Sequence, residues 1–275
     1  MSRETCRAQA LDYVESGRLK QDLARLVTRQ SVSQSEGTPE ELWAYLAEDI
    51  GPLLQDHGFE IAIHDNPLPG GPPLMIASHI EGASLPAVLV YGHGDVCNGE
   101  AQGLTPSERV FGWNSFAPLA TSSGAIAAPQ SAISGVARAV GQLRFVVGTD
   151  VDDIVPALRR HLDTNGFEMV EIACRGEPFK ATRFSLDNPW VRFVCESVAR
   201  STRQPPHIPP NLAGSLPNAM FVDILGLPTI WLPHAHAECG QHGPNEHALL
   251  SVARQAMMMM TELFLDIADG APRAA

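Results

Sequence analysis

The sequence predicts an α/β protein, because segments with a helical spacing of apolar residues alternate with short apolar runs of strand length. The chain has 275 residues, of which 44% are hydrophobic, enough for a sizeable core. At roughly 150 residues per domain, this length suggests one large domain or two modest ones. The same alternation of helical and strand-like segments returns in the last hundred residues.

The N-terminal part opens with about thirty residues of helical pattern, interrupted at Gly17. A second helix begins at Pro39, where Thr38 is a suitable N-cap and Glu41 completes a capping box, and it ends at Gly58. Three strands are predicted next: Phe59–His64, Leu74–Ile80 and Ala87–Tyr91. The last strand is apolar on both faces, which is typical of a central strand covered on both sides.

The middle of the chain, residues 98–142, is rich in Gly, Ala, Ser and Pro and predicts only one strand, near Ile133–Ala139. A β-α-β unit follows. It consists of a strand Gln142–Gly148, a helix that Thr149 or Asp150 caps and that runs to Leu162, and a strand Phe167–Ala173 that begins after Gly166.

The C-terminal part again alternates helices and a strand. The predicted elements are a helix from Asn188 and Pro189 to about Arg203, a helix Ser215–Leu225, a buried strand Pro228–Leu232 and a long helix capped by Asn245. The apolar stripe of the last helix includes Leu249, Ala256, Leu263 and Ile267. Its run Met257–Met260 is interpreted as core filling.

Charge and composition exclude several classes of function. The net charge is 19 − 31 = −12, and no basic run offsets it, so a nucleic-acid partner is not expected. The apolar runs are far shorter than the roughly 20 residues that span a bilayer, and no signal peptide is recognisable. Five scattered cysteines without a CxxC pair are typical of reduced thiols, which predicts a cytoplasmic protein.

The first candidate site follows the strand Ala87–Tyr91. The segment Tyr91-Gly-His-Gly-Asp-Val96 places His93 and Asp95 just past the carboxyl end of that strand, where open α/β sheets present ligands. The glycines leave room for a turn and for the approach of a ligand. Asp95 could accept the ring N–H of His93 and leave the other nitrogen for a metal, or the pair could simply stabilise a loop.

A second candidate site lies between residues 234 and 247, where four histidines, two glutamates and a cysteine occur within fourteen residues. His242, beside Pro244 and a helix N-terminus, is interpreted as a metal ligand. For His234, His236 and His247, taken singly, a polar loop residue is the favoured interpretation. Nucleotide-binding and serine-hydrolase motifs such as GxGxxG, GxxxxGK[ST] and GxSxG are missing from the sequence.

Together these segments resemble the M20 family of zinc metallopeptidases and deacylases, which includes glutamate carboxypeptidase, acetylornithine deacetylase and succinyl-diaminopimelate desuccinylase. Residues Val88–Val96 resemble the first zinc motif of that family, and His242-Gly-Pro-Asn-Glu246 resembles its last metal-binding motif. The segment Asn211–Pro217 is similar to its Gly-Gly-Ser-x-Pro substrate loop. Residues Gln142–Ala173 resemble half of its small lid domain, in which Arg144 matches an arginine that meets the substrate carboxylate.

The resemblance implies a three-layer α/β/α zinc-peptidase-like domain with a reduced β-α-β lid domain inserted. The two halves of the catalytic-type domain would be residues 1–103 and 177–275, with the lid remnant at 104–176. It further implies His93 and His242 as metal ligands, Asp95 as the catalytic residue that orients His93, and the Gly214–Ser215 backbone with Arg144 as the substrate-binding groups.

The chain departs from the family pattern where a large internal segment is missing. The bridging aspartate and the general-base glutamate that should follow Val96 are not found, so at most one zinc ion is expected. Glu100, His236, Glu238 and Cys239 are candidate substitute ligands.

Two functions follow. The first is a metal-dependent hydrolase of amide or peptide bonds in small N-acyl amino acids or dipeptides, with an impaired metal site. The alternative is a catalytically inactive remnant that binds at most one metal or a partner chain. The unpaired edge of the lid remnant could support a homodimer.

Overall fold

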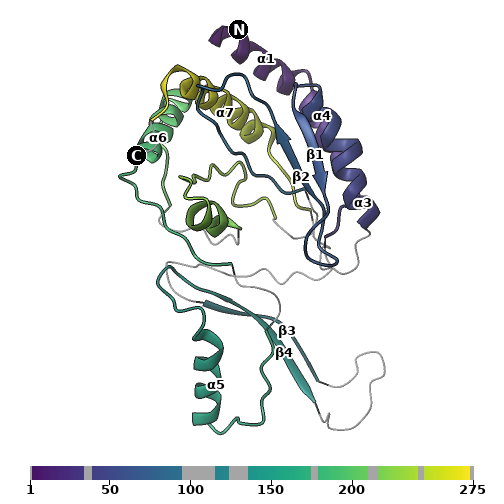
Figure 1. Cartoon of the computed structure of the whole chain (residues 1–275), viewed down its shortest axis with the longest axis vertical. Helices are drawn as coiled ribbons and strands as arrows, with labels where there is room; N and C mark the ends of the chain where they lie inside the picture. Colours follow the sequence, from purple (N-terminus) through teal and green to yellow (C-terminus); the bar gives the residue numbers. More distant parts are fainter. Residues whose placement is uncertain are drawn as a thin grey trace. The chain divides into compact units, whose positions relative to one another are not determined.

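A computed structural model of the chain describes residues 2–33, 39–94, 115–123, 136–174, 179–209, 216–240 and 245–272. Helices and strands are both present (Figure 1), as expected for an α/β protein. The chain divides into two compact units. The first comprises residues 1–105, 192–206 and 232–275, and the second comprises residues 106–191 and 207–231.

The N-terminal helices of the first unit agree with the sequence prediction. Helix α1 (Arg3–Glu15) is capped by Ser2, whose hydroxyl accepts a hydrogen bond from the Thr5 N–H at 3.1 Å. Helix α2 (Arg18–Leu26) begins directly after Gly17, which has a φ of 82°. Glycine adopts this left-handed conformation without the penalty that a Cβ atom imposes, so the predicted break at Gly17 is confirmed.

The second predicted helix is present as three consecutive segments. They are α3 (Pro39–Ala44), the π-helical turn η1 (Tyr45–Ile50) and α4 (Gly51–Gln55). The predicted cap, Thr38, lies outside the described residues. Gly58 ends the helical region with a φ of 82°. The chain then forms an antiparallel pair of strands, β1 (Glu60–His64) and β2 (Leu74–Ser78), and α4 packs against β1.

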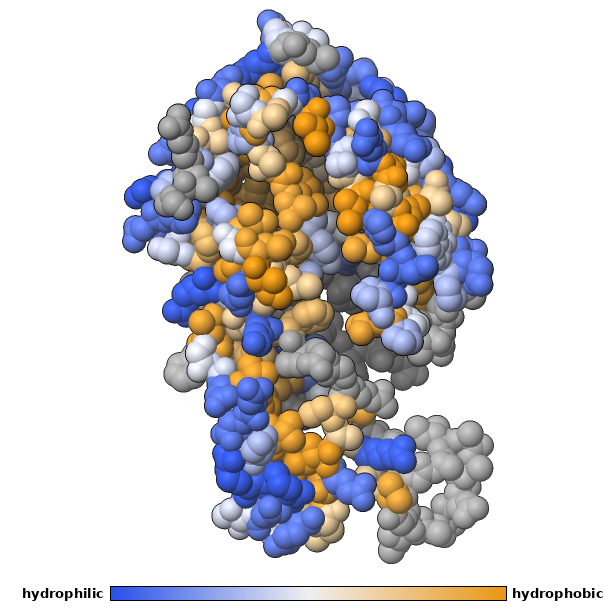
Figure 2. Space-filling model, in the orientation of Figure 1, coloured by the Kyte–Doolittle hydropathy of each residue, from blue (hydrophilic) through white to orange (hydrophobic). Residues whose placement is uncertain are grey.

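The predicted central strand Ala87–Tyr91 is wrong. Residues 87–91 form no strand, and the Val88, Leu89 and Val90 side chains are 45%, 61% and 67% exposed. Exposed apolar side chains are not confined to this run, because they are widespread on the face of the molecule that Figure 2 shows. An apolar run indicates that side chains favour burial, but it does not specify which neighbour covers them.

The core of the first unit involves helices α6 (Pro189–Thr202) and α7 (Leu250–Gly270). The Asn188 side chain accepts a hydrogen bond from the Trp190 N–H at 2.9 Å, which confirms the predicted start of α6. The buried apolar residues come from these helices: Val194, Val198, Ala256, Leu263 and Ile267. The predicted cap of the last helix is wrong, because α7 begins at Leu250 and Asn245 has a left-handed φ of 63°.

The second unit contains a hairpin that the sequence left largely unspecified. Strand β3 (Ser115–Ser123) pairs with β4 (Ala137–Arg144) in antiparallel register, with a bulge between Pro118 and Ala120. Proline lacks the N–H that a regular ladder requires at alternate positions, so a bulge beside Pro118 is expected. Helix α5 (Ile154–Thr164) follows and ends before Gly166, whose φ is 77°.

The strand predicted at Phe167–Ala173 is wrong, and Arg159 of α5 provides the physical reason. Its guanidinium donates hydrogen bonds to the Phe167 carbonyl at 3.0 Å and to the Val170 carbonyl. These carbonyls are therefore held against the helix and not by a neighbouring strand. The predicted strand Pro228–Leu232 is also not formed, and the predicted helix Ser215–Leu225 is reduced in the described residues to a short helical segment around η2 (Met220–Ile224).

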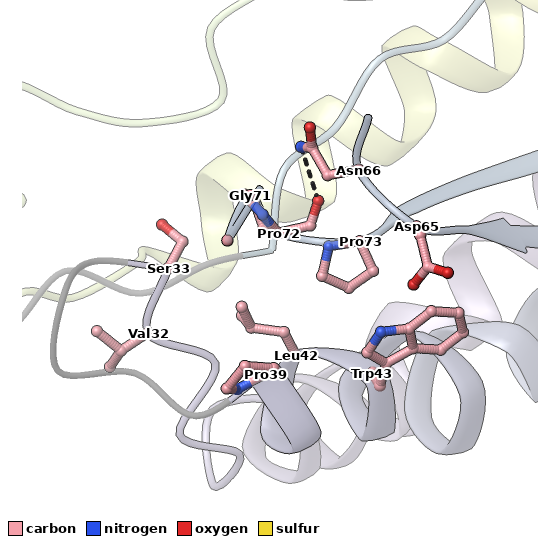
Figure 3. A pocket seen from close by; sticks show the side chains of 11 residues that line it. Val32, Ser33, Pro39, Leu42, Trp43, Asp65, Asn66, Gly71, Pro72 and Pro73 are labelled. Atoms are coloured by element: carbon pink, nitrogen blue, oxygen red, sulfur yellow. Dashed lines mark hydrogen bonds between the residues drawn. The ribbon is translucent and has the colours of Figure 1, made fainter. Parts of the chain in front are cut away.

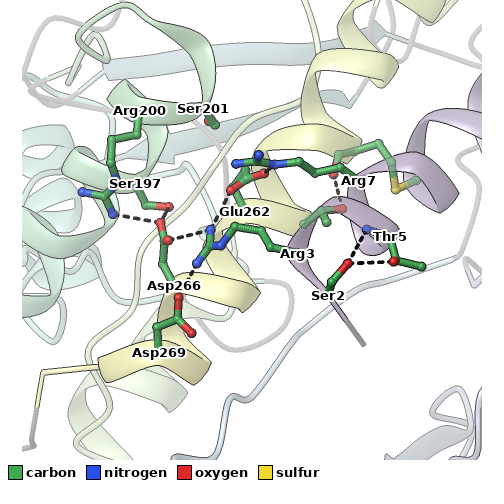
Figure 4. A network of polar contacts seen from close by, with 12 residues as sticks. Ser2, Arg3, Thr5, Arg7, Ser197, Arg200, Ser201, Glu262, Asp266 and Asp269 are labelled. Atoms are coloured by element: carbon green, nitrogen blue, oxygen red, sulfur yellow. Dashed lines mark hydrogen bonds and ion pairs between the residues drawn. The ribbon is translucent and has the colours of Figure 1, made fainter.

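One acidic side chain of α7 joins the two ends of the chain. Glu262 has a side chain only 8% exposed and accepts hydrogen bonds from the guanidinium groups of Arg3, at 2.7 Å, and Arg7 (Figure 4). Burial of a carboxylate is costly unless cations and hydrogen bonds compensate for lost water. The two arginines supply that compensation, and α1 is thereby fixed on α7.

Asp266, one helical turn further along α7, extends the same network to α6. It accepts hydrogen bonds from the Ser197 hydroxyl at 2.6 Å and from Arg200 at 2.8 Å, and it lies 2.9 Å from Arg3. Ser197 is 1% exposed, so its hydroxyl requires this partner. The network Arg3–Glu262–Asp266 therefore holds α1, α6 and α7 together.

The network changes the acidity of both carboxyl groups. The hydrogen bond from Arg7 lowers the pKa of Glu262, burial opposes this effect, and Arg3 lowers the pKa further. Burial acts to raise the pKa of Asp266, but hydrogen bonds from Ser197, Arg200 and Arg3 outweigh it and the pKa is lowered. Both groups are therefore ionised over a wider pH range in the folded chain than in the unfolded chain.

Replacing Glu262 with Gln is expected to lower the free energy of unfolding by about 2 kcal/mol, because two arginines lose a buried carboxylate partner. Urea denaturation followed by circular dichroism measures this change. The matched control is Glu15→Gln. Glu15 forms an exposed ion pair with Arg254 at 3.0 Å, and its loss should change the stability by at most about 0.5 kcal/mol. Equal effects of the two substitutions would contradict the role assigned to Glu262.

Stability is expected to fall as the pH decreases. The lowered pKa values of Glu262 and Asp266 contribute stability that is complete above the unfolded carboxyl pKa, about 4, and that is lost as these groups become protonated at lower pH. Urea denaturation at a series of pH values should show this loss, with a smaller pH dependence in Glu262→Gln. An unchanged dependence in that variant would show that other carboxyl groups are responsible.

Candidate functional site

The segment that carries His93 is attached to the N-terminal helices through its backbone. The Ser31 hydroxyl donates a hydrogen bond to the Gly94 carbonyl at 2.7 Å, and Ser31 is 1% exposed. Because the hydroxyl of a buried serine is costly to leave without a partner, this bond fixes the segment beside Ser31. Ser31 follows α2, so the position of His93 depends on a residue that is remote in sequence.

Position 94 requires a glycine because a neighbouring side chain approaches its backbone closely, and not because its backbone conformation is unusual. A Cβ atom at this position would overlap the Tyr45 side chain of η1, whereas a Cβ atom at Gly92 would meet nothing within 4 Å. The sequence predicts free space beside both glycines for a turn and a ligand. At Gly94, the aromatic ring of Tyr45 occupies that space, so the His93 segment packs against η1.

The histidine-rich loop before α7 is folded on itself. The Cys239 N–H donates to the His236 carbonyl at 3.2 Å, and the His247 N–H donates to the Cys239 carbonyl at 2.9 Å. The rings of His236 and His247 meet edge to face, with centroids 5.0 Å apart. The structure therefore brings two of the four predicted histidines and Cys239 into one turn.

His236 has an unusual property within this loop. Its Nδ1 atom is buried and has no hydrogen-bond partner in the described part of the chain. Unpaired buried nitrogen atoms are rare, and such an atom is available to a water molecule or an ion. Burial also lowers the pKa of His234, which favours the neutral imidazole that metals bind. This loop accordingly has donor chemistry that is compatible with a metal, although His236 and His247 are only two nitrogen donors.

The described residues alone do not complete a zinc site. Within residues 2–33, 39–94, 115–123, 136–174, 179–209, 216–240 and 245–272, no three His, Cys, Asp or Glu side chains are grouped so that they could hold an ion. A catalytic zinc ion typically needs three protein ligands. No catalytic step through zinc follows from these residues. Several predicted site residues lie outside the described part: Asp95, Glu100, Gly214, Ser215 and His242.

The predicted substrate-binding arginine belongs to the second unit. Arg144 is the last residue of β4, and its Nε atom donates a hydrogen bond to the Gln142 side chain at 3.3 Å. Glu238, another predicted substitute ligand, is an exposed residue of the loop before α7. The roles assigned to Arg144 and Glu238 remain predictions.

Asn218 is an organising residue of the second unit that the sequence did not reveal. Its amide donates to the Thr182 hydroxyl at 2.5 Å and accepts from the Trp231 indole at 3.0 Å. Asn218 thus connects three segments that are distant in sequence and directly follows the predicted substrate loop, which ends at Pro217. Its position after a proline at the start of a helical segment was the available signal, but its partners could not be deduced.

Comparisons with known proteins give one match. The structure is similar to the crystal structure of Sso-CP2, an M20 family metallo-carboxypeptidase from Sulfolobus solfataricus, with a TM-score of 0.47 and 19% sequence identity. The similarity covers 90% of this chain and 52% of that chain, so this chain spans about half the length of the enzyme. No family model and no curated protein matches the sequence.

No helix among the described residues is both long enough and apolar enough to traverse a lipid bilayer.

Gly94→Ala is expected to destabilise the protein by about 1–3 kcal/mol, because the added methyl group must displace the Tyr45 ring from its contact with the His93 segment. Thermal denaturation and the chemical shifts of the Tyr45 ring report the change. Gly92→Ala is the matched control, and it should have little effect because its Cβ atom enters open space. A larger loss of stability in Gly92→Ala than in Gly94→Ala would contradict this account of the segment.

Proposed function

We propose that the chain is a metal-dependent hydrolase of the M20 type, which cleaves amide or peptide bonds in small N-acyl amino acids or dipeptides. Its metal site is reduced, and it holds at most one zinc ion. The proposal rests first on the sequence segments around His93 and His242, which resemble the first and last metal-binding motifs of that family. One structural observation supports it: the segment with His93 is fixed by the Ser31 hydrogen bond and the Tyr45 contact.

The residues have distinct proposed tasks. His93 and His242 bind the ion, and Asp95 accepts the ring N–H of His93 so that the other nitrogen remains available. Arg144 binds the substrate carboxylate with the backbone of Gly214–Ser215. When bound at a hydrolytic site, zinc acts as a Lewis acid and lowers the pKa of a water molecule. Glu100, His236, Glu238 and Cys239 are the candidates for a third ligand, and among them His236 has the unpaired buried nitrogen.

The alternative is a catalytically inactive chain that binds at most one metal or a partner chain. A different observation favours it: the run Leu85–Tyr91 leaves its large apolar side chains 39–67% exposed. Contiguous apolar surface of this kind often marks an interaction site. A homodimer through the unpaired edge of the lid remnant is one form that this association could take.

The proposal predicts about one tightly bound zinc ion per chain and a zinc-dependent release of amino acid from N-acyl amino acids. Elemental analysis after dialysis measures the zinc, and a ninhydrin assay across a panel of acetylated amino acids measures the activity. His93→Ala and His242→Ala should each lose the ion and the activity together. His64→Ala, at the exposed end of β1, is the matched control and should retain both.

The outcomes separate the two functions. Zinc lost in both variants, with measurable hydrolysis in the wild type, supports the hydrolase. Bound zinc without hydrolysis of any substrate in the panel favours the inactive chain. A folded wild-type protein that binds no zinc would overturn the proposed hydrolase.

A further inference from the structure

A pocket that contains none of the residues proposed to bind metal lies between α3 and the loop that joins β1 to β2 (Figure 3). Its volume is about 430 Å³, which is within the range of small-molecule sites, roughly 300–1,000 Å³. Three prolines and an aromatic ring form much of its wall. The lining includes Pro39 and Trp43 of α3 and Asp65, Asn66, Pro72 and Pro73 of the loop.

The loop side of this pocket has a fixed shape. The Asn66 carboxamide accepts a hydrogen bond from the Leu68 N–H at 2.9 Å and donates one to the Pro72 carbonyl at 3.0 Å. Gly70 has a φ of 75°, and a Cβ atom at Gly71 would overlap the Asn66 side chain. These constraints hold the loop in one conformation, so the wall is organised before any ligand binds.

An acidic side chain, Asp65, and an aromatic side chain, Trp43, lie near each other in the pocket. In Figure 3 the Asp65 carboxylate points towards the indole ring of Trp43. Neither side chain has a hydrogen-bond or ion-pair partner within the described residues, and no Lys or Arg is among the described lining residues. The π face of an indole ring is electronegative, so the carboxylate and the ring both favour a cation between them.

We propose that this pocket binds an organic cation, a primary or quaternary ammonium group on a short apolar stem. The charged group would lie between the Asp65 carboxylate and the Trp43 ring, and the stem would contact Pro39, Pro72 and Pro73. The net charge of −12 attracts such a ligand to the chain. A metal ion is a poorer occupant, because Asp65 is the only carboxylate among the described lining residues and the aromatic and proline side chains offer no oxygen ligands.

Binding is expected to be weak, because Asp65 is exposed and water screens its charge. Choline is the test ligand, with a dissociation constant on the order of 1 mM. Its neutral counterpart is 3,3-dimethyl-1-butanol, which has the same shape without the charge and should bind at least about tenfold more weakly. The indole N–H signal of Trp43, in spectra of protein with 15N-labelled tryptophan, reports binding of both compounds.

Substitutions inside and outside the pocket are expected to differ in their effect on choline binding. Asp65→Asn should weaken choline binding about fivefold or more, because the carboxylate charge is lost. Asp56→Asn removes the same charge from an exposed position outside the pocket and should change the affinity less than about twofold. Trp43→Phe should also weaken binding, which saturation-transfer measurements on the choline methyl protons detect. His93→Ala should leave choline binding unchanged, so failure of the proposed hydrolase does not affect this test.

The source of the cation can be distinguished with a second pair of ligands. n-Butylammonium represents a free amine, and Nα-acetyl-lysine amide presents the same group on a peptide backbone. Similar affinities indicate a free amine, and tighter binding of the lysine derivative indicates a lysine side chain of a polypeptide.

Three results would overturn the proposal. They are the lack of any saturable shift with choline up to about 50 mM, equal binding of the neutral alcohol, and equal losses in Asp65→Asn and Asp56→Asn. If Asp65→Asn does not fold, the comparison of choline with its neutral counterpart on the wild-type protein and the Trp43→Phe variant decide the question.

Discussion

The first unit depends on the ionised carboxyl groups of α7, above all on Glu262. This side chain lies on the same helix as the buried residues Ala256, Leu263 and Ile267, where an unpaired charge would oppose folding. Arg3 and Arg7 compensate for that charge, and they come from the opposite end of the sequence. The same network reaches α6 through Asp266. The ion pairs of Arg3 and Arg7 with Glu262, in addition to apolar contacts, therefore determine where helix α1 lies on α7.

This constraint has a consequence for the candidate metal site. The His93 segment is held in place by Ser31 and Tyr45, which belong to the N-terminal part of the chain. The histidine-rich loop, in contrast, directly precedes α7. A site that uses both segments requires the two ends of the chain to belong to one folded body. They do so in the first unit, which unites residues 1–105 with residues 232–275. The proposed site is thus compatible with the architecture of this unit.

Sequence features that act within a few residues predicted the structure well. Elements whose formation depends on residues distant in the sequence were not predicted correctly. The break at Gly17 and the start of α6 at Asn188 follow from the backbone freedom of glycine and from a side-chain cap, both of which act within a few residues. The strands predicted at Ala87–Tyr91 and Phe167–Ala173 required neighbours that sequence cannot specify. In the second case, hydrogen bonds from Arg159 replace a strand partner. The roles of Ser31, Tyr45 and Asn218 were missed for the same reason, because their partners are distant in sequence.

Anomalous X-ray diffraction at the zinc absorption edge would show whether His93 and His242 bind one metal ion, as proposed. Crystals of the zinc-loaded protein should show one anomalous peak per chain, with nitrogen atoms of both histidines about 2.0–2.1 Å from it. A third ligand seen there would identify which candidate completes the site. A peak remote from His93 and His242, or two peaks bridged by a carboxylate, would contradict the account.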